Sequence, residues 1–141
     1  MSDQILFFDD FPLNTENQLF TRQLRRALRG TDIDVVVLDT IPVLERSLRT
    51  QMFVAIVLDI MAAMPDAPGM EALAGLEVLR RCRTGQYGEI NRNTTVYVRS
   101  ARGELHVRQR AAELGCSGYF HLGSGGDEKL ISVLKDHLVK G

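Results

Sequence analysis

Acidic and hydroxyl residues follow three apolar runs in this sequence, and their chemistry is that of a cation-binding or phosphoryl-transfer site. Asp9 and Asp10 follow one run, Asp59 follows a second and Ser100 lies just after a third. Carboxylates brought together repel one another unless a cation lies among them, and all-oxygen ligands suit Mg²⁺. Such a cation would shield the oxygens of a phosphoryl donor, so that Asp59 could attack its phosphorus atom. Ser100 could then hydrogen-bond the phosphorylated product.

Short apolar strands that alternate with amphipathic helices must position these residues. Strands are predicted at 5–8, 35–38, 53–58, 95–98 and 118–122, and helices at about 14–29, from about 42, from about 73, up to 114 and at 127–139. This alternation is typical of a doubly wound α/β fold with a parallel sheet. Run 53–58 is apolar throughout, as expected for a central strand. In such a sheet, functional groups collect where the carboxyl ends of strands meet.

Each acidic residue also has a purely structural interpretation. Aspartates after strands often form turns or cap helices, and we interpret Asp39 in that way. The adjacent pair Asp9 and Asp10 has an electrostatic cost that a turn does not require, so together with Asp59 and Ser100 it favours a functional site.

Length and composition favour one globular domain that fills residues 1–141. There is no apolar segment long enough to span a bilayer, and the first residues lack the pattern of a signal peptide, so we expect a cytoplasmic protein without membrane contact. Cys82 and Cys116 are predicted to be reduced structural thiols. The formal net charge of −1 gives no overall attraction for nucleic acid.

Four arginines form the one basic cluster that stands out, at helical spacing within 22–29. We interpret this cluster as a solvated helix face and expect no nucleic-acid partner.

The order of several short motifs resembles the receiver domains of bacterial two-component response regulators, the group that includes the chemotaxis protein CheY. The segment 5–11 resembles the first-strand motif with its acidic pair, and 57–61 resembles the phosphoacceptor motif. Ser100 and Ala101 match the Thr/Ser-Ala pair after the fourth strand, and 114–119 resembles the entry to the fifth. The resemblance covers nearly the whole chain and implies a flavodoxin/CheY-like sheet of five parallel strands in the order 2-1-3-4-5.

The resemblance also implies a role for each site residue. Asp59 would be the phosphoacceptor, Ser100 would move toward the phosphoryl group, and Tyr119 would be the aromatic residue whose rotamer follows. The implied ligands of the cofactor Mg²⁺ are Asp10, Asp59 and the backbone carbonyl of Met61, with Asp9 acting through water.

Partners follow from the same resemblance. A sensor histidine kinase or phosphotransfer protein, or a small phosphodonor, would supply the phosphoryl group. A downstream protein would bind the face formed by the fourth helix, fifth strand and fifth helix, and a homodimer is left open. The protein would be a signalling domain and not an enzyme, with at most self-catalysed phosphoryl transfer and autodephosphorylation.

The sequence departs from the family pattern at two places. Leu122 and Gly123 stand where the family has Lys-Pro, so the cation that would pair with the phosphoryl oxygens is missing. His121, Arg99 and Arg102 are the nearby basic residues that could replace it, although His121 is expected on the far side of its strand. The loop after Asp59 is also about eight residues longer than is usual in the family.

Three other functions use residues of a similar kind. The missing lysine leaves open a pseudo-receiver, an interaction module that works without phosphorylation. A phosphatase of the haloacid dehalogenase type needs a second aspartate two residues after the nucleophile, which neither Asp9 nor Asp59 has. A dinucleotide-binding site is disfavoured because the glycine-rich segment 123–126 follows the last strand and not the first.

Overall fold

Five parallel strands form the centre of the structure, a computed structural model that describes residues 3–9, 15–60, 74–101 and 103–139. Their order across the sheet is β2-β1-β3-β4-β5, and every neighbouring pair is parallel. The strands are β1 (Asp3–Phe8), β2 (Ile33–Leu38), β3 (Ala55–Leu58), β4 (Val96–Ser100) and β5 (Gly118–His121). The predicted fold class, a doubly wound α/β sheet in the order 2-1-3-4-5, is confirmed.

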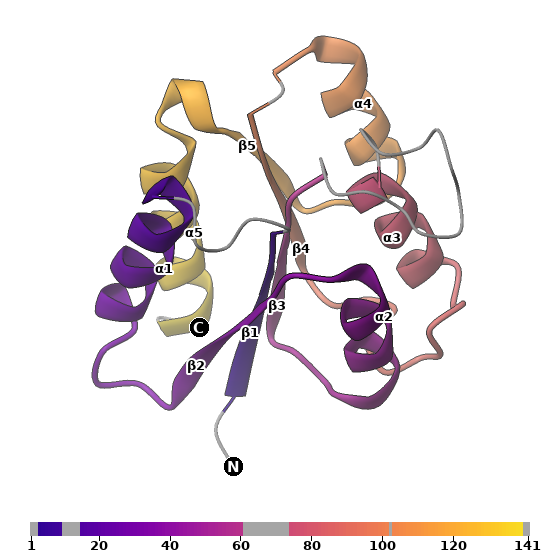
Figure 1. Cartoon of the computed structure of the whole chain (residues 1–141), viewed down its shortest axis with the longest axis horizontal. Helices are drawn as coiled ribbons and strands as arrows, with labels where there is room; N and C mark the ends of the chain where they lie inside the picture. Colours follow the sequence, from indigo (N-terminus) through magenta and orange to yellow (C-terminus); the bar gives the residue numbers. More distant parts are fainter. Residues whose placement is uncertain (1–2, 10–14, 61–73, 102, 140–141) are drawn as a thin grey trace.

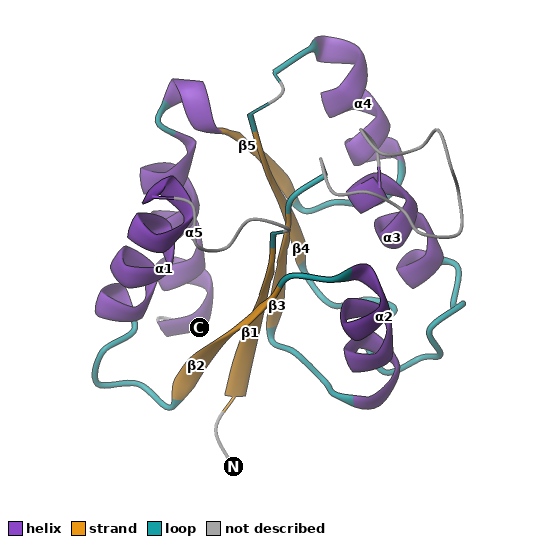
Figure 2. Cartoon of the chain, in the orientation of Figure 1, coloured by secondary structure: helices purple, strands orange, loops and turns teal. Residues whose placement is uncertain are grey.

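Helices cover both faces of this sheet (Figures 1 and 2). The helices are α1 (Thr15–Ala27), α2 (Ile41–Thr50), α3 (Ala74–Arg83), α4 (Leu105–Glu113) and α5 (Gly126–Val139). Helices α1 and α5 lie side by side on one face, and α2, α3 and α4 cover the other. Within the described ranges, no helix combines the length and apolar character needed to cross a bilayer.

The first strand shows why both faces must be covered. Ile5 and Phe7 are fully buried in the core with α1 and α5, where the Phe7 ring packs edge-on against Phe20 with centroids 5.0 Å apart. Leu6 and Phe8 are fully buried in the core with α2 and α3. Strand side chains alternate between faces, so a strand that is apolar throughout is stable only between two helical layers.

Every predicted strand was wrong at one boundary or more, by one or two residues: β1 and β2 begin two residues earlier than predicted, β4 begins one residue later and β5 ends one residue earlier. β3 begins at Ala55 and not at residue 53, because the Phe53 amide donates to Oδ1 of the buried Asn91 over 3.1 Å and leaves the sheet ladder. β4 continues to Ser100, two residues further than predicted, because β5 pairs with Arg99 and Ser100. The long loop predicted after Asp59 falls mainly on 61–73, outside the described residues.

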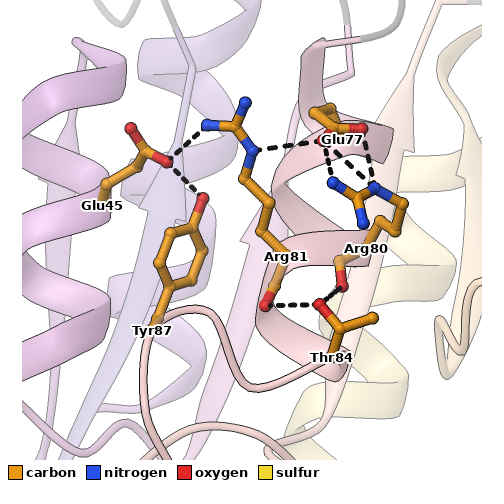
Figure 3. Close-up of polar contacts among 6 residues, drawn as sticks. All are labelled: Glu45, Glu77, Arg80, Arg81, Thr84 and Tyr87. Carbon is orange, nitrogen blue, oxygen red and sulfur yellow. Dashed lines mark hydrogen bonds and ion pairs between the residues drawn. The ribbon is translucent and has the colours of Figure 1, made fainter.

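A polar network joins α2 and α3 on the far face of the sheet from α1 (Figure 3). Arg81 contacts Glu45 of α2 at 3.0 Å and Glu77 of α3 at 3.2 Å, and Glu77 also pairs with Arg80. Tyr87 donates its hydroxyl to Glu45 over 2.6 Å. Burial and this hydrogen bond to a carboxylate raise the pKa of the Tyr87 phenol. Arg81 therefore bridges two helices through carboxylates of both.

The Glu77 carboxylate gives this network a predictable pH dependence. Its hydrogen bond from Arg80, helped by Arg81, holds the pKa of Glu77 below its usual 4.5. Because the folded pKa is depressed, the stabilisation is present above pH 4.5 and is lost as the pH falls through the folded value. We expect Glu77→Gln to lose less unfolding free energy than the wild type on going from neutral to acid pH. The difference should be about 1 kcal/mol or less, because solvent screens partly exposed ion pairs.

Urea unfolding between about pH 3 and pH 7 measures this effect. The control is Glu113→Gln, which removes a more exposed pair with Arg110 at 3.5 Å. Parallel pH profiles for wild type and Glu77→Gln would contradict the assignment.

Candidate functional site

The register of the sheet places three charged residues in one row across its carboxyl edge. Phe7 pairs with Val57, and Val57 pairs with Tyr97; all three belong to the core beneath α1 and α5. Two residues further along each strand are Asp9, Asp59 and Arg99. Alternation along a strand has a period of two, so these three side chains share the face of α1 and α5. We call Asp9, Asp59 and Arg99 the carboxyl-edge row.

Both aspartates of the row are buried, with Asp9 5% and Asp59 8% exposed. Backbone hydrogen bonds fix their positions: the Asp9 amide donates to the Leu38 carbonyl over 3.1 Å, and the Asp59 amide donates to the Phe8 carbonyl over 3.0 Å. The ladder therefore continues one residue beyond each strand. Asp10 and Met61, the other predicted cation ligands, lie outside the described residues.

The predicted hydroxyl and aromatic residues lie on β4 and β5. Ser100 is 1% exposed at the end of β4 and is in register with His121 of β5. By alternation it belongs to the face that Val98 shares, so it flanks the row from the other side of its strand. Tyr119 is half-buried against the apolar cluster of α3 and α4, with the Arg108 guanidinium 5.9 Å from its ring centre.

Arg99 is the residue of the site whose position sequence analysis missed. It is 1% exposed and is the largest fully buried side chain among the described residues. Its guanidinium lies 4.5 Å from the ring centre of Phe20 and 5.5 Å from that of Phe7. A buried cation is stable only when it is paired and hydrogen-bonded, so its partners determine what it can do.

Two helix N-termini supply those partners. Nε and Nη2 of Arg99 donate to the two carboxylate oxygens of Asp127 over 2.6 and 2.9 Å, and Nη1 donates to Oδ1 of Asn17 over 2.7 Å. Asp127 lies in the first turn of α5 and Asn17 in the first turn of α1. Nη1 is also 3.8 Å from Oδ2 of Asp9. One guanidinium thus connects the start of α1, the start of α5 and the acidic row.

The other candidates for the missing lysine have different surroundings. The ring of His121 contacts the Ala101 carbonyl at 3.1 Å and the Ser124 hydroxyl at 3.0 Å, and His121 shares its strand face with Ser100, opposite to Arg99. Leu122 begins a short 3₁₀ turn and, with Asp127, lines a hollow of about 370 Å³ beside α1. Arg102 is outside the described residues.

The donor set agrees with Mg²⁺ in chemistry. Asp9 and Asp59 are neighbouring buried carboxylates, and hard oxygen donors are what this ion prefers. In the part of the chain that the structure describes, no three His, Cys, Asp or Glu side chains form a group that could hold a metal. Arg99 already balances part of the negative charge of Asp9, so the row needs less help from a cation than two isolated carboxylates would.

Features away from the row have structural roles. Burial raises the pKa of the free thiols of Cys82 and Cys116, which makes both poor nucleophiles. The four arginines of 22–29 are exposed, and Arg25 donates to the Val35 carbonyl of the edge strand β2 over 3.3 Å.

Gly75, in the first turn of α3, lies against the backbone of Asp59 and Ile60. A Cβ added there would lie 2.5 Å from both the Asp59 carbonyl oxygen and the Ile60 Cα. The start of α3 is therefore packed closely against the end of β3.

Comparison with known proteins identifies the fold. No protein-family model matches the sequence, and no curated protein matches it. A response-regulator receiver domain from Francisella superposes with a TM-score of 0.66 at 21% identity, covering 96% of this chain and 98% of that one. A signal receiver domain of a histidine kinase from Clostridium thermocellum gives a TM-score of 0.71 at 17% identity, with coverage of 96% and 97%.

A third similar structure has a metal ion. It is the receiver domain of a sensor histidine kinase from Pseudomonas aeruginosa, with a magnesium ion coordinated in its active site cleft. It matches with a TM-score of 0.67 at 18% identity over 100% of both chains. The chain therefore has the fold of CheY-like response-regulator receiver domains.

The contact at Gly75 yields a prediction about stability. Alanine is a better helix former than glycine by about 1 kcal/mol, which alone would make Gly75→Ala stabilising. Here the added methyl group meets backbone atoms that cannot rotate away, so we expect a net destabilisation of about 1–3 kcal/mol. Urea unfolding gives the value, and a neutral or stabilised variant would show that α3 does not approach Asp59 this closely.

Proposed function

We propose that this chain is a receiver domain of two-component signal transduction that accepts a phosphoryl group on Asp59. The observation that supports this proposal is the carboxyl-edge row, in which two buried carboxylates stand beside a buried cation on adjacent strands. A sheet of this order has its functional crevice at this edge, because the strand connections diverge there.

Asp59 is the proposed nucleophile because it follows the central strand and lies between Asp9 and Arg99 in the row. One carboxylate oxygen attacks phosphorus, the bond from phosphorus to the donor breaks, and the leaving group departs with the electron pair. The product is an acyl phosphate, whose oxygens need hydrogen-bond donors and positive charge. Ser100, buried at the end of β4, is the proposed hydroxyl donor.

Mg²⁺ is the proposed cofactor. Asp10, Asp59 and the Met61 carbonyl would hold it, with Asp9 acting through water; when bound, the ion shields the phosphoryl oxygens from the carboxylates. The magnesium ion in the Pseudomonas receiver domain supports this choice of metal.

The proposed partners follow from the same class of protein. A bacterial sensor histidine kinase or phosphotransfer protein would deliver the phosphoryl group in the cytoplasm, and a downstream protein would bind the face of α4, β5 and α5. Tyr119 lies on β5 within that face, where Arg108 of α4 covers its ring. The domain would signal through protein contacts, with catalysis limited to its own phosphorylation and dephosphorylation.

Leu122 favours a second candidate, a pseudo-receiver that binds partners without phosphorylation. Leucine provides neither the charge nor the hydrogen bond that a lysine would give to a phosphoryl oxygen.

Phosphorylation by a small donor separates the two functions. Incubation with acetyl phosphate and Mg²⁺ is expected to add the mass of one phosphoryl group, and Asp59→Asn is expected to remove that addition because an amide is not a nucleophile for phosphorus. The matched control is Asp39→Asn, which changes the exposed aspartate after β2 and should leave labelling intact. Intact-protein mass spectrometry reports both, and an unlabelled wild type would favour the pseudo-receiver.

A further inference from the structure

We propose that Arg99 of β4 is the cation that binds the phosphoryl group of Asp59 in this chain, and that it releases Asp127 of α5 in order to do so. The inference rests on the proposed function, because it requires that Asp59 carries a phosphoryl group. Arg99 would provide the positive charge that Leu122 cannot, and its contact with Asp127 is the one that would change.

Position is the first argument. Arg99 is the register neighbour of Asp59, since Leu58 pairs with Val98 one residue earlier. Register neighbours in adjacent strands lie about 4.8 Å apart, well within the length of an arginine side chain. Among the described residues, Arg99 is also the only basic side chain that is buried.

Arg99 also has enough hydrogen-bond donors, in a suitable direction, to reach a second anion. An arginine has five N–H groups in a planar fork, which matches carboxylate and phosphoryl oxygens equally well. Asp127 and Asn17 receive three of them, and Nη1 already lies 3.8 Å from Asp9 in the row. The guanidinium is therefore at the acidic row before any phosphoryl group arrives.

Competition between two anions is the third argument. A phosphoryl group on Asp59 replaces the single negative charge of the carboxylate with about −1.5 to −2 on the phosphoryl oxygens, beside Arg99. Asp127 is its bidentate partner at 2.6 and 2.9 Å, and the Asp127 side chain is 26% exposed. Water can solvate Asp127 if the guanidinium leaves, and the guanidinium gives the phosphoryl group a charge-assisted hydrogen bond in addition to those proposed from Ser100 and Mg²⁺. The exchange is therefore favourable in one direction.

A change at Asp127 would reach the surface through α5. Asp127 and Asn17 belong to the first turns of α5 and α1, and these two helices lie side by side on one face (Figure 1). If Arg99 moves toward Asp59, both turns lose a hydrogen-bond partner at the same time. Phosphorylation would then loosen the starts of α1 and α5.

Binding of beryllofluoride, a phosphoryl mimic, tests the exchange through the sign of its response. Asp127→Asn weakens the competing anion, so we expect beryllofluoride to bind the variant about threefold to tenfold more tightly. Arg99→Gln should bind at least about tenfold more weakly, because a charge-assisted hydrogen bond is lost. Arg99→Lys should recover part of that loss, because the charge returns.

Two further variants control for effects of the substitutions other than loss of the Arg99 contact. Arg99→Gln leaves Asp127 and Asp9 without their buried cation, so the double variant Arg99→Gln/Asp127→Asn, with its charge balance restored, is measured alongside it. It should bind as weakly as Arg99→Gln. Glu128→Gln changes an exposed acid in the same turn of α5 and should bind like the wild type.

Hydrogen exchange provides an independent readout. Amides in the second turns of α1 and α5, which donate to the carbonyls of the first turns, should exchange faster when beryllofluoride is bound, and this change should be absent in Arg99→Gln/Asp127→Asn. Two results would show that Arg99 is a fixed structural residue and that the inference is wrong. One is that Asp127→Asn binds beryllofluoride no more tightly than the wild type; the other is that the double variant binds it as tightly as the wild type. A wild type that neither binds beryllofluoride nor accepts a phosphoryl group would instead overturn the proposed function.

Discussion

The burial of one arginine is the interaction on which this site depends. Arg99 has no route to solvent at 1% exposure, so the fold must supply its counter-charges and hydrogen-bond acceptors. It does so from the first turns of α1 and α5 and from the end of β1. The aromatic rings of Phe7 and Phe20 complete the enclosure. Removal of Arg99 would leave the buried carboxylates of the row without this counter-charge, and Asp59 in that row is the proposed acceptor of the phosphoryl group.

Parallel register explains why the charges meet. Each strand contributes its residues to alternate faces, so a fixed register between three strands aligns Asp9, Asp59 and Arg99 without any special loop. The connections then place helix N-termini at the same edge, where Asn17 and Asp127 can reach the guanidinium. The opposite face has its own charged contacts around Arg81, which join α2 to α3 (Figure 3).

Sequence patterns predicted the strands and the aspartates at their ends, because apolar runs and their acidic neighbours are local features, whereas the strand order followed from the resemblance to receiver domains. Arg99 was one of three nearby basic residues, with His121 and Arg102, that could replace the missing lysine, and the sequence did not distinguish Arg99 from Arg102. A charged residue inside a strand is a weak signal until its partners are known, and Asn17 and Asp127 are 82 and 28 residues away in sequence. Alternation from Tyr97, a core residue, was the signal that could have placed Arg99 on the inner face.

A crystal structure of the protein with Mg²⁺ and beryllofluoride tests the central claim most directly. The account predicts beryllofluoride on a carboxylate oxygen of Asp59, with a guanidinium nitrogen of Arg99 within about 3.2 Å of a fluorine and its bidentate contact with Asp127 broken. Beryllofluoride on Asp59 with Arg99 still paired to both oxygens of Asp127 would contradict it.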